Sequence, residues 1–297
     1  MQRTLRTPSH LLSAALFVGL IFLAVGALGC AADDGLSTGD GRVPDGASDG
    51  SAPGFVVAAI QYGTDDHKHV AACNDDACAL RHYIDNAADQ GAKLVVTSEY
   101  ALAKASPEPT PEVGENPGSD ASATSLIAAF SRLAATRGIY LVIDLITYKG
   151  VDPSIHYFNT QVAFDPTGKV VALHRKFNLY ENEKAQLTPG DDVSTFDTPA
   201  GKVGLLICAD IYGDEPLIKK LTKELGARII ALSSDWVKAG VDSAFFLFAK
   251  GYAVYLVAAN TTKAPGFGGG VYDDQGRVLV EKLEAKPSIL VATIPML

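Results

Sequence analysis

The sequence predicts an α/β domain in which two mixed β-sheets pack together between outer helices, an α-β-β-α sandwich. Short apolar runs rich in β-branched residues alternate with segments of helical periodicity in the first half of the domain, which favours parallel strands covered by helices. Later apolar runs are separated by short turns at residues 165–168, 199–201 and 273–276, whose Pro and Gly residues are typical of hairpins. An apolar content of 47% and a charged content of 20% are ordinary for a globular domain.

The first half of the domain alternates between strand-like and helix-like segments. Residues 55–62 (FVVAAIQY) form an apolar, β-branched run that indicates a buried strand. Apolar side chains recur at helical spacing in residues 79–90, and Gly91 ends that helix. The expected order is strand 55–62, helix 79–90, strand 93–97, a Pro-rich loop at 106–118, helix 121–137 and strand 139–148.

The second half adds hairpins to this pattern. The expected elements are hairpin strands 159–164 with 169–177 and 191–198 with 202–208, then helix 215–225, strand 228–233, helix 243–252, strand 253–259 and a last hairpin that turns at 273–276. Such a mixture of crossovers and hairpins predicts sheets with both parallel and antiparallel pairs.

Residues 1–29 have the layout of an export signal. Arg3 and Arg6 precede an uncharged apolar run at residues 11–28, and small residues then lead to Cys30. A cysteine at this place resembles the lipidation site of bacterial lipoproteins, so we expect a cleaved signal peptide of the lipoprotein type and a lipid on Cys30. Two alternatives stay open. One is an uncleaved anchor, because about 18 apolar residues approach the length of a membrane span, and the other is plain secretion.

Residues 30–54 are rich in Gly, Asp, Ser and Pro and offer little apolar surface to bury. That composition predicts a flexible linker. The folded domain is therefore expected at residues 55–297. We expect the protein to be exported to the cell envelope and to meet the membrane only through its N-terminal lipid.

The net charge of −9 argues against nucleic acid as a partner, because phosphate binding requires a basic surface. His67 and His69 lie near Cys73 and Cys78, but no second ligand pair has the spacing of a zinc site, so no metal is expected. In an exported protein we expect Cys73 and Cys78 to form a disulfide. The glycines at residues 266–270 lack the strand-then-helix context of a phosphate loop, and no cofactor is expected.

Three expected strands end in chemically reactive residues. The runs KLVVT, VVALHRK and KVGLLIC lead to Glu99, Lys176 and Cys208. Ligands of α/β proteins bind at the carboxyl ends of strands, so an acid, a cation and a thiol at three such ends are expected to meet.

The chemistry of these three side chains is complementary. A nearby cation lowers the pKa of a thiol and stabilises an oxyanion, which are the roles expected for Lys176 beside the nucleophile Cys208. Burial should raise the pKa of Glu99 toward the range that suits proton transfer. Together they predict attack on an amide or nitrile carbon and a thioester intermediate. A buried structural cysteine and a solvated acid or lysine at a strand end are the simpler interpretations of each residue alone.

The surrounding motifs resemble those of the nitrilase superfamily of carbon–nitrogen hydrolases. Residues 91–99 (GAKLVVTSE) resemble its glutamate motif, residues 174–180 (HRKFNLY) its lysine motif, and residues 196–211 (FDTPAGKVGLLICADI) its cysteine motif. The order of the three motifs also agrees. The resemblance implies a nitrilase-like α-β-β-α sandwich and a Glu99–Lys176–Cys208 catalytic triad.

Further similarity points to the vanin and biotinidase branch of that superfamily. It is carried by Glu183, Trp236 and the stretches 178–180, 195–199, 210–216, 260–261 and 268–272. The resemblance implies that Glu183 positions Lys176 or the substrate, although a solvated loop acid is the alternative. Ala209 replaces the usual aromatic residue after the cysteine, and its backbone N–H is expected in the oxyanion hole. Trp236 is either a core residue or a wall of the substrate pocket.

The sequence thus predicts an exported amidohydrolase, acting on carbon–nitrogen bonds other than peptide bonds. A small linear amide, pantetheine-like or biotinyl, is the favoured substrate. An acyl or amide transferase with the same triad and a non-catalytic binding lipoprotein remain alternatives. The sequence leaves open whether the protein is a monomer or a homodimer.

Overall fold

A computed structural model of the chain describes residues 54–212, 215–236, 241–263 and 268–297. The predicted signal peptide, Cys30 and all but the last residue of the predicted linker lie outside these residues. Within the described ranges, no helix is long and apolar enough to cross a membrane.

The first sheet has seven strands in the described part of the chain. Its order is β13-β1-β2-β4-β5-β6, and β3 pairs with β4. The strands are β1 (Gly54–Gln61), β2 (Leu94–Thr97), β3 (Glu108–Pro109), β4 (Tyr140–Lys149), β5 (His156–Phe164), β6 (Val170–Arg175) and β13 (Ser288–Pro295). β1, β2 and β4 are parallel, whereas β5 reverses direction and β6 reverses it again. β2 and β6 therefore point the same way.

The second sheet has six strands among the described residues, in the order β12-β11-β10-β9-β8-β7. They are β7 (Thr195–Thr198), β8 (Gly201–Ile207), β9 (Ile229–Ser233), β10 (Tyr255–Ala259), β11 (Gly270–Tyr272) and β12 (Val278–Glu281). β8, β9 and β10 form a parallel centre, and the flanking pairs are antiparallel.

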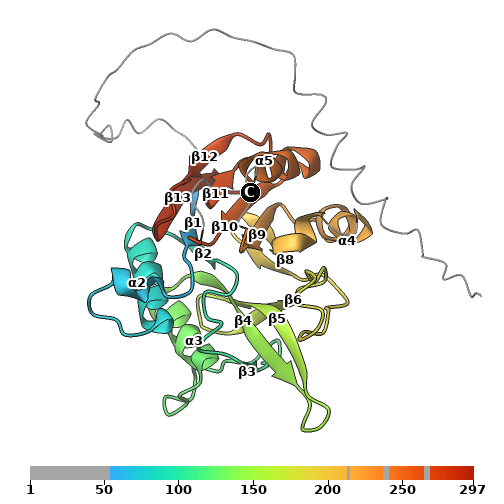
Figure 1. The fold of residues 1–297 in the computed structure, drawn as a ribbon. Helices are drawn as coiled ribbons and strands as arrows, with labels where there is room; N and C mark the ends of the chain where they lie inside the picture. The colour runs from blue at the N-terminus through green and yellow to red at the C-terminus, as the bar shows by residue number, and fades with distance from the viewer. Residues whose placement is uncertain (1–53, 213–214, 237–240, 264–267) are drawn as a thin grey trace, which may run out of the picture. The chain divides into compact units, whose positions relative to one another are not determined.

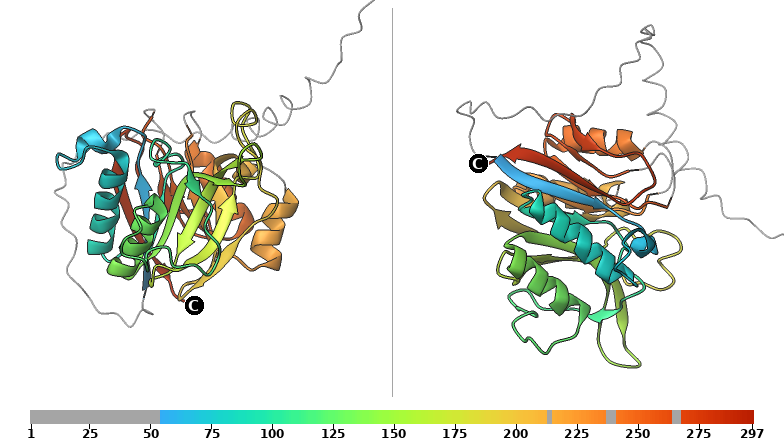
Figure 2. Two further views of the ribbon diagram at one scale, coloured as in Figure 1. Left: turned by 90° about the horizontal axis from the view of Figure 1, so that it is seen from below. Right: turned by 90° about the vertical axis from the view of Figure 1, so that its left-hand side faces the viewer.

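Helices cover the outer face of each sheet (Figure 1; Figure 2, left). α2 (Asp76–Asp89) and α3 (Leu126–Arg137) pack on the first sheet, while α4 (Glu215–Lys219), the π-helical turn Lys220–Glu224 and α5 (Val241–Tyr252) belong to the second. Strand periodicity divides the apolar side chains between the layers. In β1, for example, Val57 and Ala59 face the other sheet, whereas Ala58 and Ile60 face the helices. The predicted α-β-β-α sandwich is confirmed.

Several elements differ from the sequence prediction. β3 lies in the segment expected as a Pro-rich loop, the helix expected at 215–225 is divided between α4 and a π-helical turn, and the strand expected from residue 191 begins at Thr195. The helix expected from residue 121 begins at Leu126, because the side chain of Ser125 caps it by accepting a hydrogen bond from the Ala128 N–H. Asp120 instead forms a local turn with Ser122. The sequence analysis placed no strand at residues 288–295, yet β13 pairs with β1 along the whole length of β1.

Candidate active site

The three strand ends predicted to carry the chemistry lie together. Glu99 follows β2 and Lys176 follows β6, which point the same way in the first sheet. Cys208 follows β8 in the second sheet. The last residue of β8, Ile207, pairs with Ser233 of β9. The Ser233 hydroxyl donates to the Thr97 carbonyl over 2.7 Å, which joins the corresponding ends of the two sheets.

Lys176 lies between two carboxylates. Its Nζ atom is 2.8 Å from Oε1 of Glu99 and 2.8 Å from each carboxylate oxygen of Glu183. All three side chains are buried. Glu99 Oε1 also accepts a hydrogen bond of 2.8 Å from the Asn159 amide. Lys176 is therefore held by ion pairs from both sides.

Glu183 is part of this buried network, and it is not a solvated loop acid. Its carboxylate accepts hydrogen bonds from the Tyr100 hydroxyl and, over 2.6 Å, from the Tyr180 backbone N–H. With both Lys176 contacts, these bonds fix the carboxylate in one orientation.

Cys208 begins the 3₁₀ turn Cys208–Tyr212 and has a φ angle of 45°. This left-handed conformation is unfavourable for a side chain with a Cβ atom, and such strain is concentrated at functional sites. The thiol interacts with the Glu99 carboxylate, and the Trp236 indole Nε1 donates to Cys208 Sγ over 2.8 Å. The sharp turn thus presents sulfur to both a base and a hydrogen-bond donor.

Burial dominates the ionisation of the site. It raises the pKa of Glu99 from 4.5 to about 7, although the Lys176 ammonium opposes the rise. Burial, and then the charge of Glu99, also raises the pKa of the Cys208 thiol well above its ordinary value. Lys176 acts to lower the pKa of Cys208, as the sequence suggested, but it is outweighed. The raised pKa favours a neutral thiol in the resting site.

The ammonium of Lys176 remains charged. Burial acts to lower its pKa, but the nearby Glu99 and Cys208 and the hydrogen bonds that the ammonium donates to the carboxylates together raise that pKa above 10.5. A permanent positive charge therefore lies beside the thiol.

Trp236 belongs to the site as well as to the core. Its ring stacks between Tyr212 and Phe245, with ring centroids 4.8 and 4.9 Å away, and Asn260 Oδ1 accepts a hydrogen bond from its backbone N–H over 2.9 Å. The indole is only 9% exposed, so this packing fixes the N–H that reaches sulfur. Ala209, the next residue after the nucleophile, is partly exposed.

Asp144 is a buried acid near the site that the sequence analysis missed. It interrupts the apolar run of β4, and its Oδ1 accepts a hydrogen bond of 2.8 Å from the Tyr100 backbone N–H. Burial, followed by the charge of Glu99, raises its pKa well above the ordinary value. A lone acid within a strongly apolar strand was the available signal, since such residues are rarely buried without a role.

Cys73 and Cys78 are joined by a disulfide at the start of α2. Their sulfur atoms are therefore not free to bind metal. Nearby, ligand-type atoms of Asp65, His67 and Asp76 lie within 4.8 Å of one another. The Asp76 carboxylate, however, accepts hydrogen bonds from the Tyr62 hydroxyl and the Asp65 backbone N–H, so protein groups already occupy it.

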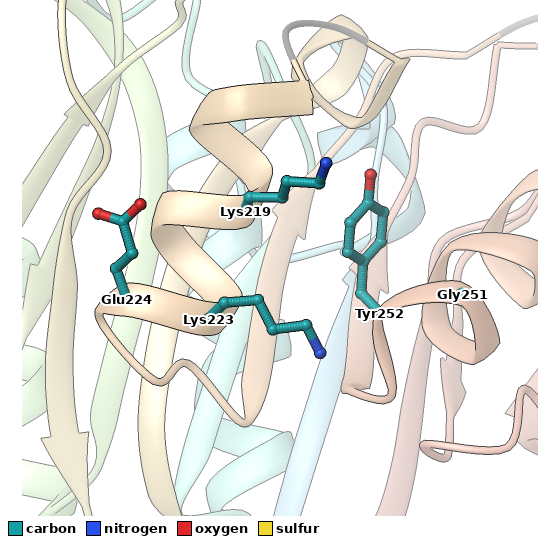
Figure 3. Close-up of a pocket in the computed structure, with 5 residues that line it drawn as sticks. All are labelled: Lys219, Lys223, Glu224, Gly251 and Tyr252. Atoms are coloured by element: carbon teal, nitrogen blue, oxygen red, sulfur yellow. The ribbon is translucent and has the colours of Figure 1, made fainter.

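A surface cavity of about 600 Å³ lies away from the triad. It is lined by Lys219, Lys223, Glu224, Gly251 and Tyr252. Figure 3 shows Lys219 and Lys223 extending toward the side of Tyr252, whereas Glu224 points to the opposite side of its helix. None of the reactive side chains at the strand ends lines this cavity.

Comparison with known proteins agrees with the geometry. A family model described as carbon-nitrogen hydrolase matches residues 56–296. Human pantetheinase is 27% identical over 261 residues, covering 74% of this chain and 51% of its own length. Biotinidase of Rattus norvegicus is 29% identical over 198 residues, covering 57% and 38%. The chain spans about half the length, or less, of these curated relatives.

The fold is also that of a solved amidase. A mutant of the amidase from Nesterenkonia sp. AN1 aligns with a TM-score of 0.63 at 22% identity, covering 86% of this chain and 94% of the amidase. The predicted resemblance to the nitrilase superfamily, near vanins and biotinidase, is confirmed. The chain belongs to the carbon–nitrogen hydrolase family.

Proposed function

We propose that this protein hydrolyses small linear amides, with Cys208 as nucleophile, Glu99 as general base and acid, and Lys176 as the oxyanion-stabilising cation. The observation that carries the proposal is the contact of a thiol on a strained turn with a buried carboxylate, itself 2.8 Å from a buried ammonium. Nucleophile, proton carrier and fixed positive charge are the groups that acyl transfer requires.

The first step follows from the resting protonation states. Glu99 removes the thiol proton as sulfur attacks the carbonyl carbon of the amide, because Cys208 is a neutral thiol at rest. The carbonyl oxygen becomes an oxyanion, which the Lys176 ammonium stabilises. The backbone N–H of Ala209 is a second donor, since the first N–H groups of a helical turn have no acceptor within it.

The second step breaks the carbon–nitrogen bond. Protonated Glu99 gives its proton to the leaving nitrogen, and an amine departs from the tetrahedral intermediate. Cys208 then holds the acyl group as a thioester. Glu99, ionised again, removes a proton from water as the water oxygen attacks the thioester carbon. The carbon–sulfur bond then breaks, the carboxylic acid is released, and Glu99 returns its proton to the sulfur, which restores the thiol.

Two observations on similar proteins support this chemistry. In a mutant of the Nesterenkonia amidase, the acetamide moiety of fluoroacetamide adds covalently at the active-site cysteine. Relatives of the chain include proteins named pantetheine hydrolase and biotinidase. They support a secondary amide, pantetheine-like or biotinyl, as the substrate class.

The small side chain of Ala209 also favours a bulky acyl group, because it takes little space beside the nucleophile. The test compares kcat/KM of the purified chain on pantetheine, a biotinyl amide, a simple primary amide and an aromatic nitrile. We expect one of the secondary amides to be preferred. A tenfold preference for the primary amide or nitrile, about 1.4 kcal/mol in transition-state stabilisation, would reject the substrate class but not amide hydrolysis. Absence of turnover on every amide would reject the function.

We also propose that the enzyme is exported and held at the cell envelope by a lipid on Cys30. The charged start, the apolar run and the small residues before Cys30 support this. Mass spectrometry of the mature protein should find residues 1–29 removed and a lipid on Cys30. An intact N-terminus would contradict it.

A further inference from the structure

Asp210 lies two residues after the nucleophile and is 3% exposed. Its carboxylate accepts hydrogen bonds from four nitrogen donors, although it touches none of the groups that react in the proposed mechanism. The donors are the backbone N–H groups of Phe177 (3.0 Å), Asn178 (2.8 Å) and Ile207 (3.0 Å) and the Nε2 of His174 (2.8 Å).

These donors come from the two segments that carry the cation and the nucleophile. His174 and Phe177 lie on either side of Lys176 in the sequence. His174 is within β6, which ends at Arg175, and Phe177 follows Lys176 directly. Ile207 directly precedes Cys208. One buried carboxylate therefore joins the backbone around Lys176 to the backbone around Cys208.

The hydrogen bond between Ile207 and Asp210 spans the nucleophile Cys208. It runs from the Ile207 N–H to Asp210 Oδ2, so it closes the turn in which Cys208 has its positive φ. A strained residue keeps its conformation only where its surroundings hold it. The other oxygen, Oδ1, accepts from the two residues that follow Lys176. Oδ2 also accepts from His174 Nε2, so this single oxygen already joins the two segments, and Oδ1 adds two further bonds to the segment of Lys176.

Only a carboxylate suits this arrangement fully. It accepts hydrogen bonds at two oxygens and donates none, and its bonds to N–H groups are stronger than those of a neutral amide. An asparagine would have one oxygen, and its NH₂ group would face N–H donors. The side chain of Asp210 is therefore matched to its four donors at a buried position.

We propose that Asp210 is a positioning residue that fixes the Lys176 ammonium relative to the Cys208 thiol. The proposal rests on the proposed function, because it assigns Asp210 a role in that same reaction. It makes the thiol's ionisation depend on a carboxylate that contacts neither the thiol nor the ammonium. Without the hydrogen bonds to Asp210, Lys176 can move away from the sulfur. That movement weakens the charge interaction that favours the thiolate.

The test uses Asp210→Asn, with Asp197→Asn as the matched control, since Asp197 pairs with Lys202 on the surface. The rate of Cys208 alkylation by iodoacetamide is measured against pH, together with kcat, KM and the thermal midpoint. For Asp210→Asn we expect the alkylation profile to move to higher pH by about one unit and kcat to fall at least about tenfold, with KM changing little. Asp197→Asn should match the wild type.

A second variant, His174→Phe, removes one donor and keeps an aromatic ring at the position. We expect a shift of the same sign and smaller size, and this variant decides the question if Asp210→Asn does not fold. A folded variant with a lower thermal midpoint but an unchanged alkylation profile and kcat would overturn the proposal, because it would show a purely structural role. Alkylation requires no amide turnover, so failure of the proposed function and failure of the positioning role give different results.

Discussion

The Lys176 ammonium lies 2.8 Å from the Glu99 carboxylate, so the proposed base and the proposed oxyanion-stabilising cation are in contact before any substrate binds. Both are buried, and burial of an ionised group is unfavourable unless it is paired. The pair therefore keeps a positive charge beside the thiol while the pKa of Glu99 stays near 7. Exchange of either partner for a neutral residue should therefore lower both activity and stability, because it leaves the other charge buried without its partner.

Replacement of Lys176 by arginine tests the geometry of the cation. Lys176→Arg keeps the charge but brings a larger, planar group between two carboxylates. We expect kcat to fall by at least about 100-fold, the scale of losing one oxyanion donor. Steady-state kinetics measures this, with Lys184→Arg on the exposed surface of the same loop as the control. A near-normal rate for Lys176→Arg would place the ammonium outside the reaction.

Replacement of Glu183 by glutamine tests whether this second carboxylate holds the Lys176 ammonium in place. Glu183→Gln preserves size but removes the charge that faces Lys176 and weakens the bonds from Tyr100 and Tyr180. A hydrogen bond to a charged group contributes about 1.5–3 kcal/mol, so we expect kcat/KM to fall by about 10- to 100-fold. Glu181→Gln changes an exposed acid in the same loop and should have no effect. Equal activity of the two variants would remove Glu183 from the mechanism.

The pH dependence should separate activity from stability. As the general base, Glu99 must be ionised, so kcat/KM is expected to rise with pH and to level off above an apparent pKa near 7. Stability should change in the opposite direction. The folded-state pKa lies above 4.5, so the folded chain binds the proton more tightly, and this stabilisation is lost as pH rises from about 4.5 through about 7.

Thermal unfolding and kinetics over pH 4–9 measure both trends. Glu99→Gln cannot titrate at this position, so its thermal midpoint should vary less with pH across that window than the wild-type midpoint. Identical pH dependence of stability in the two proteins would show that Glu99 titrates normally.

The sequence was sufficient to predict the layers and the three reactive strand ends, because these depend on local patterns. β2 and β8 are mainly apolar, β6 begins with four apolar residues, and a reactive residue follows each strand within two positions. Asn159 and Asp144 were not predicted, because their roles arise from strands that pair far from the motifs. The raised pKa of the Cys208 thiol was not predicted either. Its pKa depends on how deeply the thiol is buried, and no spacing in the sequence reports that depth.

The start of α3 illustrates the same limit on a smaller scale. Asp120, Ser122 and Ser125 are all residue types that cap helices. Asp120 bonds to Ser122 in a turn, whereas Ser125 bonds to Ala128 and begins the helix. Which of these residues caps the helix depends on packing, so the sequence pattern alone could not predict where the helix begins.

The central claim is that acyl transfer passes through Cys208. The most direct measurement is turnover of the preferred amide by Cys208→Ala, combined with peptide mass spectrometry of wild-type protein quenched in acid during turnover. We predict that Cys208→Ala keeps its fold by circular dichroism and releases no amine above background, while the wild-type peptide that contains Cys208 gains the mass of the acyl group. Substantial amine release by folded Cys208→Ala would contradict the account.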